Sequence, residues 1–204
     1  MGYPSFAYNN GLINKAEELG LKLSFSICNL WIKYKLPYRR EFCDKIGDYI
    51  VADKKGHPRF NVYDIRKPCV TPMCYDFSEL EFYLNRFDVQ LELDVPGRKW
   101  ESCNANVYMA LYEDIVLDAS EAVRSVLNRG LNVLIYNGDK DYICNWEGTD
   151  LWLEELEWRG SMFYRREEWI NQDGMRMKKA FNLAYIVIKE AGHMVPMDQP
   201  EIGL

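Results

Sequence analysis

Two short apolar runs in the C-terminal half of the chain have the pattern of buried β-strands. Residues 133–136 (VLIY) lie between Gly130 and the pair Asn137-Gly138, and residues 184–188 (AYIVI) form a second such run. Continuous apolar runs of this length, bounded by turn residues, are typical of strands in a parallel sheet that is covered on both faces. The sequence therefore predicts an α/β fold with both strands in its sheet.

Helical spacing of apolar residues predicts most of the remaining structure. We expect a helix over residues 8–28 with a break at Gly20, and two short helices within 30–49. The apolar positions of residues 103–129 keep one helical period, which predicts a single long helix that ends before Gly130.

Shorter helices are predicted in the middle of the chain and between the strands. Ser78 and Glu81 have the spacing of a capping box, which predicts a helix from Ser78 through Leu84 and a second short one over 87–91. Residues 149–158 form an amphipathic pattern and predict a further helix.

Acidic residues and a histidine directly follow the two predicted strands. Asp139 and Asp141 come after the first, and His193 comes after the second. Open α/β sheets bind ligands outside the carboxyl ends of their strands, so these groups are expected to meet there. Acid followed by histidine is also the second half of the Ser, Asp, His order of α/β-hydrolases. From the residues alone, either aspartate is a candidate acid.

The chain resembles the serine carboxypeptidases in several motifs. VLIYNGDKDYICNW (133–146) and GHMVPMDQPE (192–201) resemble the Asp and His motifs of that family. NVYDIRKPC (61–69), YLN (83–85) and ESCN (101–104) follow the family order. The resemblance covers nearly the whole chain, most weakly between Lys33 and His57, and it corresponds to the C-terminal half of whole family members.

The resemblance implies a fold and a division of the chain. It implies the C-terminal part of an α/β-hydrolase sheet, preceded by a helical cap insertion. We expect residues 1–121 to form the cap region with two local disulfides, and residues 122–204 to form the core segment. Strands within 160–179 are expected to form a hairpin with the last sheet strand.

The resemblance also assigns roles to individual residues. It implies that Asp141 and His193 are the catalytic acid and base, and that Asp139 accepts backbone or turn hydrogen bonds. It places Cys144, Ile143 and Met194 in an apolar pocket for the substrate side chain next to the cleaved bond. The implied activity is hydrolysis of C-terminal peptide bonds without a cofactor, although family relatives with acyltransferase or cyanohydrin-cleaving activity share these motifs.

The nucleophile of such a triad is missing from these residues. No G-x-S-x-G motif occurs, and the nearest serine in composition, Ser5, is flanked by Pro4 and Phe6. The family places its G-E-S-Y-A-G motif upstream, so we expect the chain alone to be inactive and to need an N-terminal half as partner. Cys144 acting as the nucleophile is an alternative. A non-catalytic remnant that binds peptides or a partner protein is another.

Six cysteines are few for a small disulfide scaffold and many for an ordinary cytosolic enzyme. The resemblance pairs Cys28 with Cys43 and Cys69 with Cys74, links Cys103 to the missing half, and leaves Cys144 free. Six unpaired thiols in a reducing compartment are the alternative. No C-x-x-C pair occurs, so a structural zinc site is not expected.

The composition favours a globular domain and argues against a nucleic-acid partner. The chain has 204 residues, 48% hydrophobic and 27% charged, which is typical of a globular domain. A net charge of −6 without a basic cluster argues against a nucleic-acid partner. We expect no membrane span and no signal peptide in this chain. The resemblance implies a vacuole, a lysosome or the cell exterior, although no N-x-S/T sequon is present. His57, in the turn over 54–58, is expected to be exposed.

Overall fold

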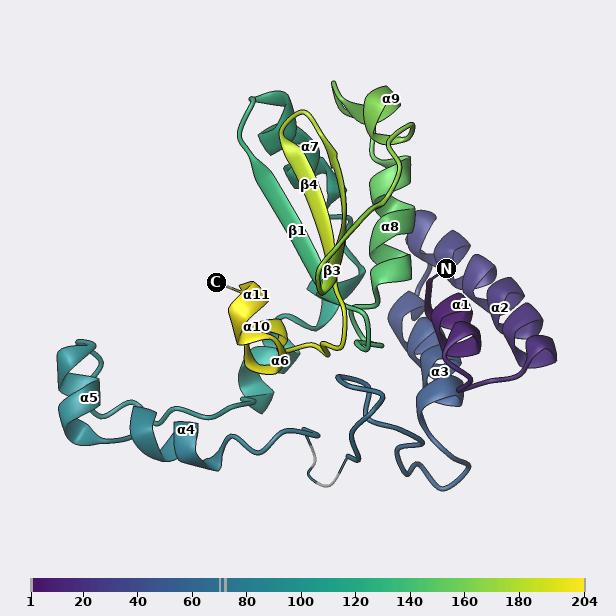
Figure 1. Ribbon diagram of the computed structural model, residues 1–204. Helices are drawn as coiled ribbons and strands as arrows, with labels where there is room; N and C mark the ends of the chain where they lie inside the picture. The colour runs from purple at the N-terminus through teal and green to yellow at the C-terminus, as the bar shows by residue number, and fades with distance from the viewer. Residues whose placement is uncertain (1, 70, 72, 204) are drawn as a thin grey trace. The chain divides into compact units, whose positions relative to one another are not determined.

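The computed structural model describes residues 2–69, 71 and 73–203, which contain helices and one four-stranded sheet (Figure 1). In chain order the elements are α1 (Gly2–Asn9), α2 (Lys15–Lys33), α3 (Arg39–Val51), α4 (Ser78–Leu84), α5 (Phe87–Glu92), α6 (Ala105–Ala110), the 3-10 helix η1 (Tyr112–Val116), α7 (Ser120–Asn128), β1 (Val133–Gly138), α8 (Trp146–Glu155), α9 (Ser161–Tyr164), β2 (Ile170–Gln172), β3 (Met175–Ala180), β4 (Leu183–Ile188), α10 (Val195–Asp198) and α11 (Pro200–Gly203).

The two predicted strands are neighbours in the sheet and run parallel. The strand order is β1-β4-β3-β2, and the register of the parallel pair runs from Val133 opposite Leu183 to Gly138 opposite Ile188. Strand β3 is antiparallel to β4 and forms the expected hairpin with it, and β2 is antiparallel to β3 on its other side. The α/β class predicted from the sequence is confirmed, and both strands of the parallel pair end at one edge of the sheet.

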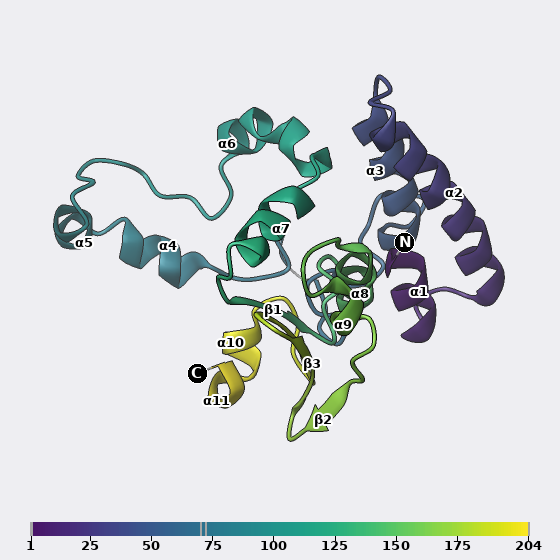
Figure 2. The same cartoon turned by 90° about the horizontal axis from the view of Figure 1, so that it is seen from above.

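Helices cover both faces of this sheet (Figure 2). One face packs against α7, α8 and α9, and α10 and α11 lie on the other. Buried side chains form a core on each face: on the first Leu127, Leu153, Trp158, Tyr164, Tyr185 and Val187, and on the second Ile188, Ala191 and Val195. Coverage of both faces explains the continuous apolar run of β4, whereas β1 leaves Leu134 and Tyr136 exposed on one face.

Helices α1, α2 and α3 pack around the loop that follows β1. Tyr142 of that loop is buried and contacts the rings of Tyr3, Phe6 and Phe60. A disulfide between Cys28 and Cys43 joins α2 to α3. The N-terminal helices therefore support the segment that carries Asp141.

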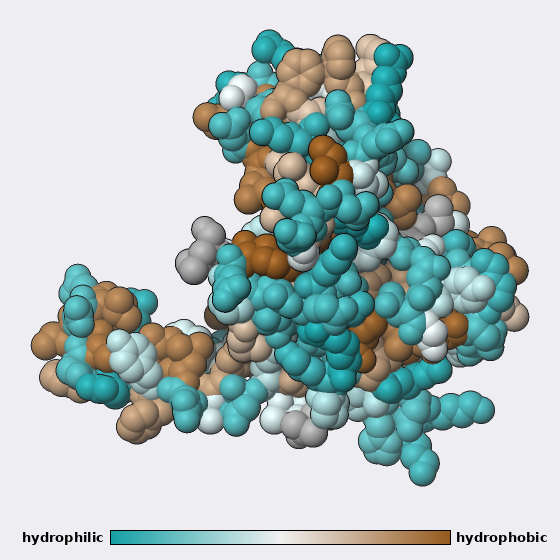
Figure 3. Space-filling view, in the orientation of Figure 1, coloured by the Kyte–Doolittle hydropathy of each residue, from teal (hydrophilic) through white to brown (hydrophobic). Residues whose placement is uncertain are grey.

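The chain forms two compact units. Residues up to 68, together with residues from 118 onwards, make the first, and residues 69–117 make the second, with α4, α5, α6 and η1. Exposed apolar side chains gather on α4 and α5 of the second unit (Figure 3), among them Phe82, Tyr83, Phe87 and Leu91. The cap boundary predicted near residue 121 stays a prediction.

The single helix predicted over 8–28 is wrong in its boundaries. The segment contains the end of α1 and the start of α2, and Gly20 lies inside α2. The break comes earlier, at Asn14, whose side chain accepts the backbone N–H of Glu17 at 3.0 Å while the Glu17 carboxylate accepts that of Asn14 at 2.8 Å. This capping box starts a new helix at Lys15.

The long helix predicted over 103–129 is also wrong, because it divides into α6, η1 and α7. The carboxylate of Asp118 accepts the backbone N–H of Ser120 at 2.9 Å, immediately before the first turn of α7. A side chain that bonds the backbone in this way competes with helix continuation.

The capping box predicted at Ser78 does not form. Asp76 accepts the Ser78 N–H at 3.0 Å, and the Glu81 carboxylate instead accepts the N–H of Ser102 at 3.1 Å. The helices predicted there, α4 and α5, are present. Within the described residues, no helix combines the length and apolar character that crossing a bilayer requires.

Candidate functional site

Asp141 and His193 meet at the carboxyl end of the parallel strand pair. Asp141 lies in the loop after β1 and His193 in the loop after β4. Nδ1 of His193 is 2.8 Å from Oδ2 of Asp141. The predicted contact between these two side chains is confirmed, while the catalytic roles stay predictions.

The carboxylate of Asp141 is buried and fully engaged. Only 2% of the residue is exposed, and its second oxygen, Oδ1, accepts the backbone N–H of Cys144 at 3.1 Å. Because an ionised carboxylate only accepts hydrogen bonds, the proton between the pair belongs to Nδ1 of His193. In the neutral imidazole, Asp141 thus holds the proton on Nδ1, and Nε2 is the nitrogen that can accept a proton.

The same contact makes the imidazole strongly basic. The hydrogen bond to Asp141 raises the pKa of His193 from 6.5 to about 10, and a hydrogen bond with Cys144 adds to it, against a smaller opposing effect of burial. The contact with Asp141 therefore favours the protonated ring in this chain.

Glycines allow the two loops to approach closely. A Cβ at Gly138 would lie 2.2 Å from the carbonyl oxygens of both Ala191 and Gly192, and a Cβ at Gly192 would lie 2.5 Å from the carbonyl oxygen of Tyr63. Real Cβ atoms do not come this close to backbone, so a side chain at either position would displace the loop that carries His193.

Cys144 lies beside the Asp141–His193 pair. One ligand-type atom each from Asp141, Cys144 and His193 lies within 4.8 Å of the others. Groups of these kinds also bind metal ions. Here, however, a carboxylate oxygen and Nδ1 already share a hydrogen bond, which fits an acid–base pair better.

The predicted substrate pocket residues adjoin this pair in sequence. Ile143 and Cys144 are exposed and Met194 is half-buried. The Tyr3 hydroxyl donates to the Ile143 carbonyl at 2.9 Å, and the Asn137 amide donates to the Cys144 carbonyl at 2.7 Å. Burial, with smaller effects of Cys144 and Asp141, raises the pKa of Tyr3, so its hydroxyl stays a neutral donor. The pocket itself stays a prediction.

The alternative acid, Asp139, points elsewhere. Its Oδ2 lies 3.2 Å from Nζ of Lys140, and its Oδ1 is buried with no hydrogen-bond partner among the described residues. The expected backbone hydrogen bonds to this carboxylate are therefore not found there. His57 is exposed in its turn, as predicted, with Nδ1 3.2 Å from Oδ2 of Asp53.

The cysteines form the pairs that the resemblance implied. Cys28–Cys43 and Cys69–Cys74 are disulfides with Cα atoms 5.3 and 4.3 Å apart. Cys103 and Cys144 are free and exposed. The structure thus differs from the alternative of six free thiols, and the partner of Cys103 stays a prediction.

Sequence reasoning assigned no role to two buried carboxylates beneath the histidine loop. Asp64 is fully buried, and the side chain of Asp198 is 7% exposed. Both belong to the stretches that carry the family resemblance, 61–69 and 192–201, and this was the available signal.

A polar cleft beside α8 does not contain the pair. It has a volume of about 680 Å³, and its lining includes Asp139, Trp146, Asp150 and Arg176.

Comparisons with known proteins agree with the motifs. A family model described as serine carboxypeptidase matches residues 1–204. Serine carboxypeptidase-like 47 of Arabidopsis thaliana is 36% identical over 214 residues, covering 99% of this chain and 42% of the relative. Serine carboxypeptidase 3 of Oryza sativa subsp. japonica is 37% identical over 213 residues, with the same coverage. The chain thus spans about 42% of the length of these relatives.

A solved structure shows the same fold. Kex1(delta)p, a prohormone-processing carboxypeptidase from Saccharomyces cerevisiae, matches with a TM-score of 0.76 and 20% identity, over 98% of this chain and 49% of that one. The predicted α/β-hydrolase sheet is confirmed by this likeness.

Proposed function

The chain belongs to the serine carboxypeptidase family, and from that premise we propose that it supplies the acid and base of a Ser-His-Asp triad that hydrolyses C-terminal peptide bonds. The observation that carries this proposal is the 2.8 Å hydrogen bond between Nδ1 of His193 and the buried carboxylate of Asp141. Nε2 of His193 takes the proton of the serine hydroxyl during attack and passes it to the leaving amine. Asp141 orients the ring and stabilises the imidazolium.

The nucleophilic serine comes from a part of the protein outside these 204 residues. No serine of the chain lies in a G-x-S-x-G motif. Without the serine there is no nucleophile to attack the peptide carbonyl, and without the oxyanion donors the transition state is not stabilised. The chain alone is therefore inactive.

Completion of the site lowers the pKa of His193. A general base works best with a pKa near the working pH, whereas a pKa of about 10 keeps the ring protonated. The His193 side chain is 37% exposed, and covering it removes water that favours the cation. The remaining polypeptide thereby turns an imidazolium into a usable base.

Ile143, Cys144 and Met194 line the pocket for the residue that precedes the cleaved bond. Ile143 and Cys144 offer exposed, largely apolar surface beside the base, which favours substrates with a hydrophobic penultimate residue. Cys103 forms a disulfide with the remaining polypeptide. Disulfides form in oxidising compartments, so a secretory or vacuolar location follows from the Cys28–Cys43 and Cys69–Cys74 pairs.

A fluorophosphonate probe, which reacts with activated serines, tests the proposal. We expect no labelling of the 204-residue chain, and labelling of a serine outside it when the chain is produced together with the upstream segment of its own gene. His193→Ala in that complete protein should abolish labelling, and Cys144→Ser should preserve it. Stoichiometric labelling of the chain alone, or a complete protein that never labels, would contradict the proposal, and the second result would favour a binding remnant.

A further inference from the structure

A loop far from the strands in sequence connects the two loops of the candidate site. The carbonyl oxygen of Tyr63 accepts the backbone N–H of His193 at 2.8 Å. The carbonyl oxygen of Val62 accepts the N–H groups of Tyr142 and Ile143, each at 3.0 Å. Residues 62 and 63 thus hold the backbone on both sides of the Asp141–His193 pair.

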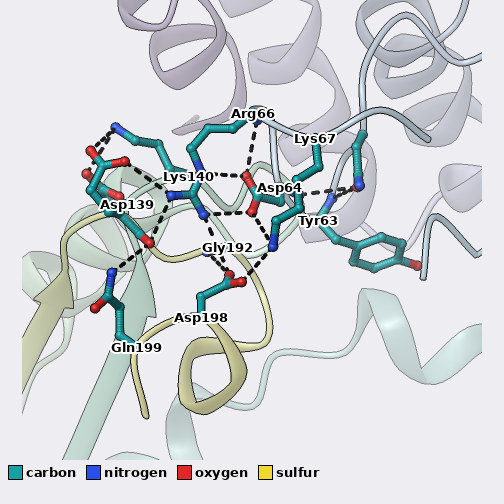
Figure 4. A network of polar contacts seen from close by, with 11 residues as sticks. Tyr63, Asp64, Arg66, Lys67, Asp139, Lys140, Gly192, Asp198 and Gln199 are labelled. Carbon is teal, nitrogen blue, oxygen red and sulfur yellow. Dashed lines mark hydrogen bonds and ion pairs between the residues drawn. The ribbon is translucent and has the colours of Figure 1, made fainter. Parts of the chain in front are cut away.

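A buried ion pair fixes the shape of this loop. Asp64 is fully buried, and its carboxylate accepts hydrogen bonds from Nη2 and Nε of Arg66 at 2.7 and 2.8 Å (Figure 4). Burial favours a higher pKa of Asp64, but the hydrogen bonds from Arg66 and Lys67 outweigh it, so the pKa is lowered and the carboxylate stays charged. A buried charge of this kind persists only where it is fully paired.

The same cations reach the residues on either side of His193. Nη1 of Arg66 donates to the carbonyl oxygen of Glu190 at 2.9 Å, a residue in the left-handed region with a φ of 54°. Asp198 accepts the backbone N–H of Gly192 at 2.7 Å and the ammonium of Lys67 at 2.6 Å. Figure 4 shows Arg66 and Lys67 between the carboxylates of Asp64 and Asp198.

We propose that Asp64, Arg66 and Asp198 are positioning residues for His193, because their network fixes the backbone that leads into the histidine and thereby sets its hydrogen bond to Asp141. The contacts to Glu190, Gly192 and His193 itself hold this loop, together with hydrogen bonds from the Lys140 N–H to the Ala191 carbonyl and from the Gln199 amide to the Glu190 carbonyl. A displacement of about 1 Å between reacting groups can cost on the order of a hundredfold in rate. The inference rests on the proposed function, in which His193 is the base.

Nuclear magnetic resonance of the 204-residue chain, with ¹⁵N-labelled histidine, tests the proposal without any activity. The chain has two histidines, so His57 is an internal reference. We expect Asp198→Ala to lower the pKa of His193 by about one unit or more and to move its Nδ1 proton signal upfield, because the hydrogen bond to Asp141 lengthens. Asp198→Asn keeps one oxygen that can accept the Gly192 N–H, so it should lower the pKa of His193 by less than Asp198→Ala does.

Two further variants distinguish a change in the position of His193 from the direct effect of a lost charge on its pKa. Glu190→Ala also removes one carboxylate that pairs with Arg66, but that side chain is 63% exposed and the Glu190 carbonyl remains, so the pKa of His193 should change by less than about 0.3 units. Arg66→Gln removes a cation, which by charge alone would raise the pKa of His193, whereas loss of positioning lowers it.

The outcomes distinguish this proposal from the proposed function. If Asp141→Asn shifts the pKa of His193 while Asp198→Ala and Arg66→Gln leave it unchanged or raise it, the network has no positioning role. If instead the complete protein still reacts with fluorophosphonate after His193→Ala, the proposed function fails and the resonance result stands. Backbone spectra of each variant identify any that does not fold. If Asp198→Ala or Arg66→Gln does not fold, the comparison of the His193 pKa in Asp198→Asn and in Glu190→Ala tests the proposal: a larger decrease in Asp198→Asn supports positioning, and equal values contradict it.

Discussion

Nδ1 of His193 lies 2.8 Å from Oδ2 of Asp141, although 52 residues separate the two in the chain. They meet because β1 and β4 are adjacent and parallel, with Gly138 opposite Ile188 at the end of the shared register. Each side chain then needs only a short loop to reach the same edge of the sheet.

Asp141→Asn should lower the pKa of His193 from about 10 toward 6.5, because an amide stabilises the imidazolium far less than a carboxylate does. A histidine-resolved titration by nuclear magnetic resonance measures this value. Asp139→Asn is the matched control, since that carboxylate faces Lys140, and it should leave the titration of His193 nearly unchanged. Equal shifts in the two variants would show that the hydrogen bond is not the cause.

The pair should also make stability depend on pH. The folded pKa of His193 is raised, so its stabilising effect is complete below about 6.5 and is lost as the pH rises through about 10. Because the ring is partly exposed, we expect His193→Gln to lower the free energy of unfolding by only about 1 kcal/mol near pH 6. Urea unfolding of both proteins across the range measures the gap, which should shrink above pH 10. A gap that widens with pH would reverse the sign argued here.

Gly138→Ala should destabilise the protein by about 2–4 kcal/mol, because the new Cβ meets two backbone carbonyls that cannot move without shifting the histidine loop. Gly20→Ala is the control, since Gly20 lies inside α2 with open space around it, and it should stabilise the protein by up to about 1 kcal/mol. Denaturant unfolding compares the two. A neutral Gly138→Ala would mean that the loops are less closely packed than described.

Alkylation should separate the cysteines into two classes. Iodoacetamide applied to the native, non-reduced chain should modify Cys103 and Cys144, which are free and exposed, and leave the four disulfide-bonded cysteines unmodified. Peptide mass spectrometry before and after reduction identifies the modified sites. Modification of Cys28 or Cys69 without reductant would contradict the disulfide pairing.

Local patterns in the sequence were sufficient for the two strands and for the expectation that an acid and a histidine meet at their carboxyl ends, whereas the choice of Asp141 over Asp139 came from the family resemblance. The apolar run that became β4 is buried or half-buried at every position, whereas β1 leaves Leu134 and Tyr136 exposed, and the loop after each strand carries one residue of the Asp141–His193 pair. Periodicity was less reliable for helix boundaries. The side chains of Asn14 and Asp118 accept backbone N–H groups where α2 and α7 begin. Such a hydrogen bond ends one helix and starts the next, while the spacing of apolar residues continues across the break.

Only the tertiary structure decided how the pair is supported. The proposed positioning roles depend on contacts of residues 62–67 with the loops after β1 and β4, and no spacing within 61–69 encodes those partners. Sequence periodicity reports which face of an element is buried, whereas the contacts of Arg66 with Glu190 and of Lys67 with Asp198 join segments more than a hundred residues apart. The sequence therefore determined which groups end the two parallel strands, and the packing of the 61–67 loop decided how they are held.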